Sequence, residues 1–127
     1  MAVWNVGSFS EQILNLVDDI PAGISGALND IVERKIANPV EEYTGASIGT
    51  EGIEAKYQGP ILNFALADVL SAMEIQGVDA DNIKLGDLSI KKGGGSNLTS
   101  SAKAYEAQGM QQLKNLGKNY RFGKANG

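Results

Sequence analysis

The sequence predicts a mainly α protein: a bundle of four helices, one short β-ribbon between the third and fourth helices, and an extended C-terminal arm. Apolar residues recur every three or four positions along most of the chain, whereas a period of two is convincing only in residues 82–95. Hydrophobic residues make up 43% of the chain but aromatic ones only 6%, so the core must consist mainly of small aliphatic side chains, which suit closely packed helices. The length of 127 residues predicts one packed domain.

The first helix is expected to begin at Ser8. Residues Ser8 to Glu11 fit a capping box, in which the serine hydroxyl caps a backbone N–H and the glutamate side chain reaches back to the cap. Trp4, ahead of this helix, is expected to plug the core beside it, with an aromatic contact to a neighbouring molecule as the alternative. The helix ends before Pro21, and its apolar stripe contains Ile13, Leu14 and Val17.

The second helix is expected to start near residues 23–25. Pro39 interrupts it, because proline lacks a backbone donor and clashes with the preceding turn. The helix therefore either ends near Ala37 or kinks there and resumes through Tyr43, and Thr44 with Gly45 closes it. Its buried face is expected to contain Leu28, Ile31, Val32 and Ile36.

A loop and the core helix follow. Residues 46–59 show no sustained period and predict a loop, with a short strand that could pair with the ribbon as an open possibility. Pro60 is expected to open the third helix, because a missing N–H costs nothing in the first turn. Gly77 is its expected C-cap. The apolar pattern of this helix is the clearest in the chain and contains Leu62, Leu66, Val69, Leu70 and Met73.

The β-ribbon is predicted in residues 82–95. Two apolar pairs alternate with polar residues, but a three-residue step separates the pairs, so the strand must bulge or turn at Gly86. An isolated ribbon is marginally stable in water and needs a helix or a neighbouring subunit to pack against. We expect it to contact the adjacent subunit through its apolar residues Ile83, Leu85, Leu88 and Ile90.

The fourth helix is expected to begin after caps in residues 97–101 and to end at Gly117. Residues 118–127 lack a helical period and are basic, so they are expected to form an extended arm that is disordered or orders on a partner. The chain is thereby divided into a helical domain, 1–117, and an arm, 118–127. The buried face of the helix is expected to contain Leu98, Ala102, Tyr105, Gly109, Leu113 and Leu116.

The residue inventory argues against an enzyme. The chain has no cysteine and no histidine, which removes thiolate metal sites, the commonest zinc ligand and the usual partner of a nucleophilic serine. The adjacent carboxylates Asp18-Asp19 and Glu41-Glu42 point away from each other on a helix and are expected to be solvated. No catalytic residue, cofactor or metal is therefore expected. The sequence also shows no signal peptide and no apolar run of about 20 residues, so a soluble protein without membrane contact is expected.

Charge is distributed unevenly. Residues 1–90 contain fourteen of the fifteen acidic residues and four of the eleven basic ones, whereas residues 91–127 contain one acid and seven bases. This asymmetry indicates head-to-tail contacts between copies or a basic end that docks on an acidic partner. Binding of nucleic acid by the basic end is the alternative, because Lys118, Tyr120, Arg121, Phe122 and Lys124 interleave bases with aromatic residues.

The order of motifs in the second half resembles one known family. Residues 66–73, Gly77 with Val78 and Asp79, the ribbon sequence from Ile83 to Gly93, and then residues 101–110 and 113–117 resemble the head-tail connectors, or adaptors, of tailed bacteriophages. Tyr43-Thr44-Gly45 also resembles a sequence that ends an earlier helix in that family. The resemblance covers roughly residues 25–117, and the glycine-rich loop 46–59 and Pro39 depart from it.

The resemblance implies a structural virion protein of the neck, made in the host cytoplasm. Such a protein forms a ring, typically dodecameric, beneath the portal protein, binds the next tail or neck component, and surrounds a channel through which DNA passes without sequence-specific binding. It also implies that the C-terminal segment docks on the portal, which assigns this role to Lys118, Tyr120, Arg121, Phe122 and Lys124. The alternative function is a small helical nucleic-acid-binding module that uses the same basic end.

Overall fold

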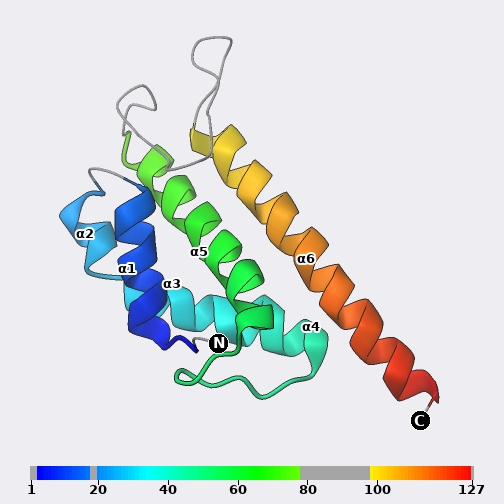
Figure 1. The fold of residues 1–127 in the computed structure, drawn as a ribbon. Coiled ribbons are helices and arrows are strands. Elements are labelled where there is room, and N and C mark those ends of the chain that lie inside the picture. Colours follow the sequence, from blue (N-terminus) through cyan, green and yellow to red (C-terminus); the bar gives the residue numbers. More distant parts are fainter. Residues whose placement is uncertain (1–2, 18–19, 78–97, 127) are drawn as a thin grey trace.

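A computed structural model describes residues 3–17, 20–77 and 98–126, with the side chains of 98–99 and 117–126 excepted. The protein is mainly helical, as the sequence predicts (Figure 1). The elements are α1 (Val6–Leu16), α2 (Ala22–Ser25), α3 (Leu28–Lys35), the π-helical segment η1 (Ile36–Glu41), α4 (Glu42–Thr44), α5 (Ala55–Ile75) and α6 (Leu98–Asn126).

The two long helices α5 and α6 run antiparallel side by side, and α1, α2 and α3 pack on the other side of α5 (Figure 1). The four-helix arrangement predicted from the sequence is not observed, because the segment between α1 and α5 is divided into short pieces. An isolated antiparallel bridge pairs Trp4 with Ile53, and no extended strand is found within the described residues. The predicted ribbon 82–95, with Ile83, Leu85, Leu88 and Ile90, lies outside the described residues.

Helix α1 begins one turn earlier than the sequence predicts. Asn5 is the N-cap: its side-chain oxygen accepts a hydrogen bond from the Ser8 backbone N–H (2.9 Å), and the Ser8 hydroxyl accepts one from the Asn5 N–H (3.2 Å). The capping box predicted between Ser8 and Glu11 is therefore wrong. Asparagine caps as well as serine does, and the earlier start places Val6 and Phe9 on the buried stripe together with Ile13.

Of the two outcomes expected at Pro39, a helix end near Ala37 or a kink after which the helix resumes, the structure shows the kink. Asn38 leaves helical geometry (φ −146°, ψ 114°), the Asn38–Pro39 peptide bond is cis, and the helix resumes through α4. Gly45 then ends α4 in the left-handed region (φ 76°), as the predicted helix end requires. Leu28, Ile31, Val32 and Ile36 are all buried, which confirms the predicted core face.

The loop before α5 is anchored at several points. The Glu41 carboxylate accepts hydrogen bonds from the backbone N–H groups of Ile48 (2.6 Å) and Gly49 (3.0 Å). Buried Ile53 exchanges two backbone hydrogen bonds with Trp4, whose ring packs edge-on against Phe9 at 4.9 Å. Trp4 is thus the core plug expected from the sequence.

Helix α5 starts at Ala55, so the prediction that Pro60 opens it is wrong. The bridge to Trp4 fixes Ile53 immediately before the helix, and Tyr57 then packs against the core from the first turn. Buried Pro60 lies in the second turn of α5, where its backbone cannot donate a hydrogen bond. The C-terminal end is as predicted, because Gly77 has a left-handed backbone (φ 80°) just past the last turn.

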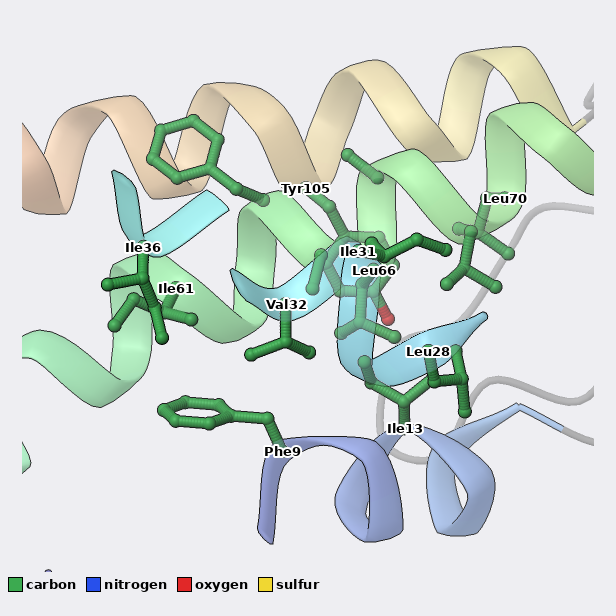
Figure 2. Packing of buried hydrophobic residues seen from close by; sticks show 14 of the residues in the cluster. Phe9, Ile13, Leu28, Ile31, Val32, Ile36, Ile61, Leu66, Leu70 and Tyr105 are labelled. Carbon is green, nitrogen blue, oxygen red and sulfur yellow. The ribbon is translucent and has the colours of Figure 1, made fainter. Parts of the chain in front are cut away.

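The core is one cluster centred on α5. Figure 2 shows Phe9 and Ile13 of α1 pointing toward Val32 and Leu28 of α3, with the side chains of α5 beyond them. Leu66, Val69, Leu70 and Met73 are at most 1% exposed, and Leu62 packs against the cluster, so the predicted core stripe is confirmed.

Helix α6 runs past the predicted end at Gly117 and continues to Asn126. The extended conformation predicted for residues 118–127 is therefore wrong for residues 118–126. One glycine costs about 1 kcal/mol inside a helix but keeps its backbone N–H, and no proline follows it. The residues after it include lysines and an arginine, which are good helix formers, so the helix propagates through the glycine.

The buried face of α6 agrees with the prediction at Ala102, Tyr105, Gly109 and Leu113, whereas Leu116 is only half-buried and the side chain of Leu98 is not described. Gly109 is a point of close approach between α6 and α5. A Cβ at this position would lie 3.2 Å from the Asn63 Cβ and 3.3 Å from two carbons of the Phe64 ring. The two helices therefore pack backbone against side chain at this point, and only glycine fits without a shift of α5.

We predict that Gly109→Leu lowers the free energy of unfolding by about 1–3 kcal/mol or more, because the added atoms overfill the α5–α6 contact. Thermal or denaturant unfolding followed by circular dichroism measures the effect. Gly23→Leu is the matched control, because no atom lies within 4 Å of a Cβ at Gly23. The packing argument fails if the two variants are equally stable.

Candidate functional site

A groove lies where α3, α5 and α6 meet. Its volume is about 210 Å³, and it combines an apolar floor with four charged side chains. Helix α3 contributes Lys35, α5 contributes Phe64, Ala67, Asp68 and Ser71, and α6 contributes Ala102, Lys103 and Glu106.

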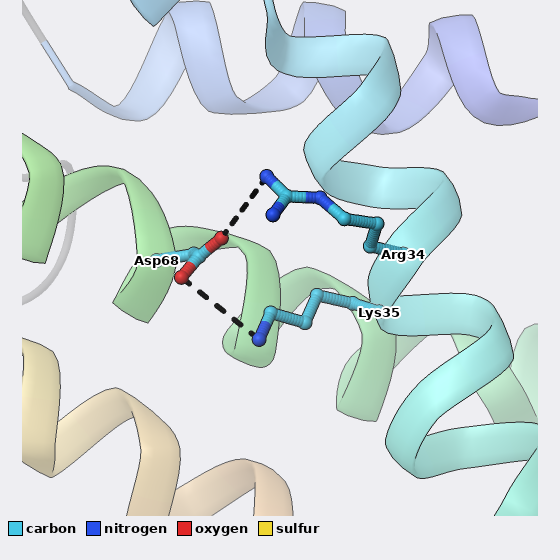
Figure 3. A network of polar contacts seen from close by, with 3 residues as sticks. All are labelled: Arg34, Lys35 and Asp68. Carbon is cyan, nitrogen blue, oxygen red and sulfur yellow. Dashed lines mark ion pairs between the residues drawn. The ribbon is translucent and has the colours of Figure 1, made fainter.

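Asp68 is the polar centre of this groove. Its two carboxylate oxygens face successive cations at the end of α3: Arg34 Nη2 lies 3.8 Å from one oxygen and Lys35 Nζ 3.9 Å from the other (Figure 3). Basic residues in the last turn of α3 also interact favourably with the helix dipole. Because the distances are long and the Asp68 side chain is 34% exposed, each pair is weak.

The charges that line the groove balance. The positive charges of Lys35 and Lys103 equal in number the negative charges of Asp68 and Glu106. The groove therefore has no net charge that would favour an anionic or a cationic ligand. The described residues contain no group of three carboxylate, histidine or cysteine side chains that could hold a metal ion. The ion pairs of Asp68 join α3 to α5, and α6 forms the third wall of the groove.

A second polar contact joins α5 and α6 near the close approach at Gly109. The Asn63 side-chain amide donates a hydrogen bond to the Gln112 side-chain oxygen (2.8 Å), and Asn63 is only 9% exposed. Buried amides require partners, so this bond fixes the register of the two helices. The register places the start of α5 opposite the region of residue 117, and Figure 1 shows the C-terminal part of α6 projecting past α5.

The structure places the predicted site residues as follows. Lys118, Tyr120, Arg121, Phe122 and Lys124 lie on the projecting helical end of α6, and their side chains are not described. They are not among the described residues that line the groove around Asp68. The predicted subunit-contact residues of the ribbon lie outside the described ranges. The structure therefore tests neither the portal-docking nor the subunit-contact assignment.

Sequence reasoning missed Asp68, Asn63 and Gln112. A signal for Asn63 was available, because it is a polar residue four positions before Ala67 on an otherwise apolar helix face. Glu41 was expected to be solvated, yet its carboxylate holds the loop through two backbone N–H groups. Asp18 and Asp19 lie outside the described residues.

Comparison of the chain with protein-family models, curated proteins and solved structures found no match in any of the three. In residues 3–17, 20–77 and 98–126, no helix combines the length and apolar character that crossing a membrane requires. Arguments about function therefore depend on the residues themselves.

We predict that Asp68→Asn lowers the free energy of unfolding by at most about 1 kcal/mol, and that salt reduces the difference, because both ion pairs are long and partly exposed. Urea unfolding at low and high ionic strength checks this. Glu54→Gln is the matched control, because Glu54 forms an ion pair with Lys56 (3.8 Å) in which both side chains are exposed. A loss well above this limit, or one that salt leaves unchanged, would contradict the surface character of the network.

Burial raises the pKa of the Tyr105 hydroxyl above its usual value near 10. The unfolded chain loses this proton first, so above about pH 10 it binds fewer protons than the folded state, and stability falls as pH rises through the folded-state pKa. We predict that Tyr105→Phe lacks this part of the alkaline loss. The free energy of unfolding of both proteins should be measured from about pH 8 to about pH 11. Above about pH 10 the value for Tyr105→Phe should rise relative to the value for the wild type. A difference between the two unfolding free energies that stays constant over this pH range would contradict the prediction.

Proposed function

We propose that this chain is a head-tail connector of a tailed bacteriophage: a structural, non-enzymatic virion protein that forms a ring beneath the portal and joins the capsid to the tail. The basic, projecting end of α6 is the observation that carries the proposal. Helix α6 extends past α5, and seven of the eleven basic residues lie in residues 91–127 (Figure 1). A charged helix that projects from a packed bundle is suited to contact another protein.

The proposed docking element is the segment 118–126 of α6. Lys118, Arg121 and Lys124 follow one another at steps of three residues, a spacing at which residues are neighbours on the surface of a helix. In helical form ten residues span about 15 Å, compared with up to ~35 Å when extended. The proposed contact with the portal is therefore a helix laid against a surface, and the extended arm expected from the sequence is not needed.

The acidic part of the chain supports the proposed DNA channel. Fourteen of the fifteen acidic residues lie in residues 1–90, and negative walls let a polyanion pass without the salt-sensitive attraction that basic walls create. In this proposal DNA is a passenger without sequence-specific contacts. The ring, with twelve copies as the family would suggest, sits in the virion neck and presents its other face to the next tail component.

Deletion of residues 118–127 should abolish binding to the portal protein of the same phage while the helical fold of residues 1–117 persists. Pull-down or calorimetric titration with the portal measures binding, and circular dichroism checks the fold. Replacement of Lys118, Arg121 and Lys124 with alanine removes the positive charges but keeps the length of the helix. This variant therefore shows whether portal binding depends on the charges or on the length of the segment. Undiminished portal binding by the truncated chain would refute the docking role.

The same proteins distinguish the nucleic-acid-binding alternative. Titration of the isolated chain with single- and double-stranded DNA at moderate salt should give no binding in the micromolar range if the basic end docks on protein. Micromolar or tighter binding that is lost in the truncated chain would favour the alternative, because phosphate contacts supply most of such affinity.

A further inference from the structure

The outward face of α3 contains an open hollow with two carboxylates. The hollow measures about 520 Å³, and the described residues that line it all belong to the α3 region: Ala27, Asp30, Glu33, Arg34 and Ala37. These residues lie on the side of the helix opposite Leu28 and Val32, which are buried in the core. The alanines at its two ends leave room for a neighbouring helix to approach closely.

The residues that line this hollow carry a net negative charge. Arg34 directs its guanidinium toward Asp68 on α5 at 3.8 Å, so its charge is partly compensated (Figure 3). In the described part of the chain, no ion pair involves Asp30 or Glu33, and both residues are exposed. A cationic side chain brought to the hollow would therefore meet two carboxylates one helical turn apart.

The outward face of α6 has complementary character. Lys103, Ala107, Gln111 and Lys114 are all exposed and follow one another at steps of four, four and three, so they form one stripe opposite buried Tyr105. The stripe contains two lysines, a small residue and no acid, and Lys103 at its edge also lines the groove that contains Asp68 and Glu106. The described residues provide no ion-pair partner for Lys103 or Lys114.

The two surfaces cannot meet within one molecule, because each is the solvent-facing side of a different helix of the same bundle (Figure 1). We propose that the α6 stripe, Lys103, Ala107, Gln111 and Lys114, docks across the α3 hollow of a second copy of this chain. The contact uses different patches on the two partners, so it is head-to-tail, and repeated contacts of this kind generate a closed ring when the rotation closes. The inference deepens the connector proposal by assigning a subunit interface, and it does not involve the portal-docking segment.

Charge reversal in pairs tests the interface. Asp30→Lys with Glu33→Lys, and separately Lys103→Glu with Lys114→Glu, should each weaken self-association of the full chain roughly tenfold or more at about 0.02 M salt, because like charges would then face each other. Combining all four substitutions restores the complementary charges and the wild-type net charge, and should restore association. Sedimentation velocity over a concentration series measures this, and circular dichroism verifies that each variant is folded.

Glu51→Lys with Glu54→Lys is the matched control. It changes the net charge as the α3 reversal does but alters the loop before α5, and it should associate like the wild type. Association of the wild type should also weaken at about 0.5 M salt. The inference is overturned if the wild type remains monomeric at every concentration at low salt, if either reversal associates like the wild type, or if the fourfold variant stays dissociated. A ring that forms on the portal and is insensitive to these substitutions would refute the interface but support the connector function. Charge-dependent self-association without any binding to the portal would support the interface but refute the connector function.

Discussion

The close contact of α5 with α6 at Gly109 is the constraint on which the rest of the structure depends. A glycine at this point lets the α6 backbone approach Asn63 and Phe64, and the hydrogen bond from Asn63 to Gln112 fixes which residues of the two helices lie opposite each other. That register determines that α6 outruns α5 by its final turns, where the basic residues are concentrated. It also sets the groove around Asp68, whose third wall is α6. A change in this one contact would move both the groove and the projecting end.

The N-terminal segment and the loop before α5 are held to the core by a few local contacts. The bridge between Trp4 and Ile53, the packing of Trp4 on Phe9, and the Glu41 carboxylate tie the N-terminal segment and the loop to the core. Apart from the half-buried Lys35 and Glu41, the charged side chains described in residues 3–54 are exposed, where water and salt weaken their interactions. Electrostatics therefore contributes little to the stability of the monomer, and the opposite charges of the two ends are available for contacts between molecules.

The sequence predicted best what hydrophobic periodicity controls. The stripes of α3 and α5, most of the buried face of α6 and an interruption of the helix at Pro39 were foreseen, because each follows from burial or from a missing backbone donor. Helix boundaries were predicted less well. Both Asn5 and Ser8 can cap a helix, and both Ala55 and Pro60 can lie in a first turn, so tertiary contacts of Phe9 and Ile53 made the choice. Gly117 was given too much weight as a helix end, and the pairing of Asn63 with Gln112 across 49 positions leaves no local signature.

The central claim is that many copies of this chain assemble on a portal. The most direct test is the mass of the complex formed when purified chain is added to the isolated portal of the same phage, measured by native mass spectrometry. The account predicts a closed assembly that carries a fixed number of copies per portal ring, close to one per portal subunit. A chain that stays monomeric, with the mass of the portal unchanged even at saturating concentration, would contradict it.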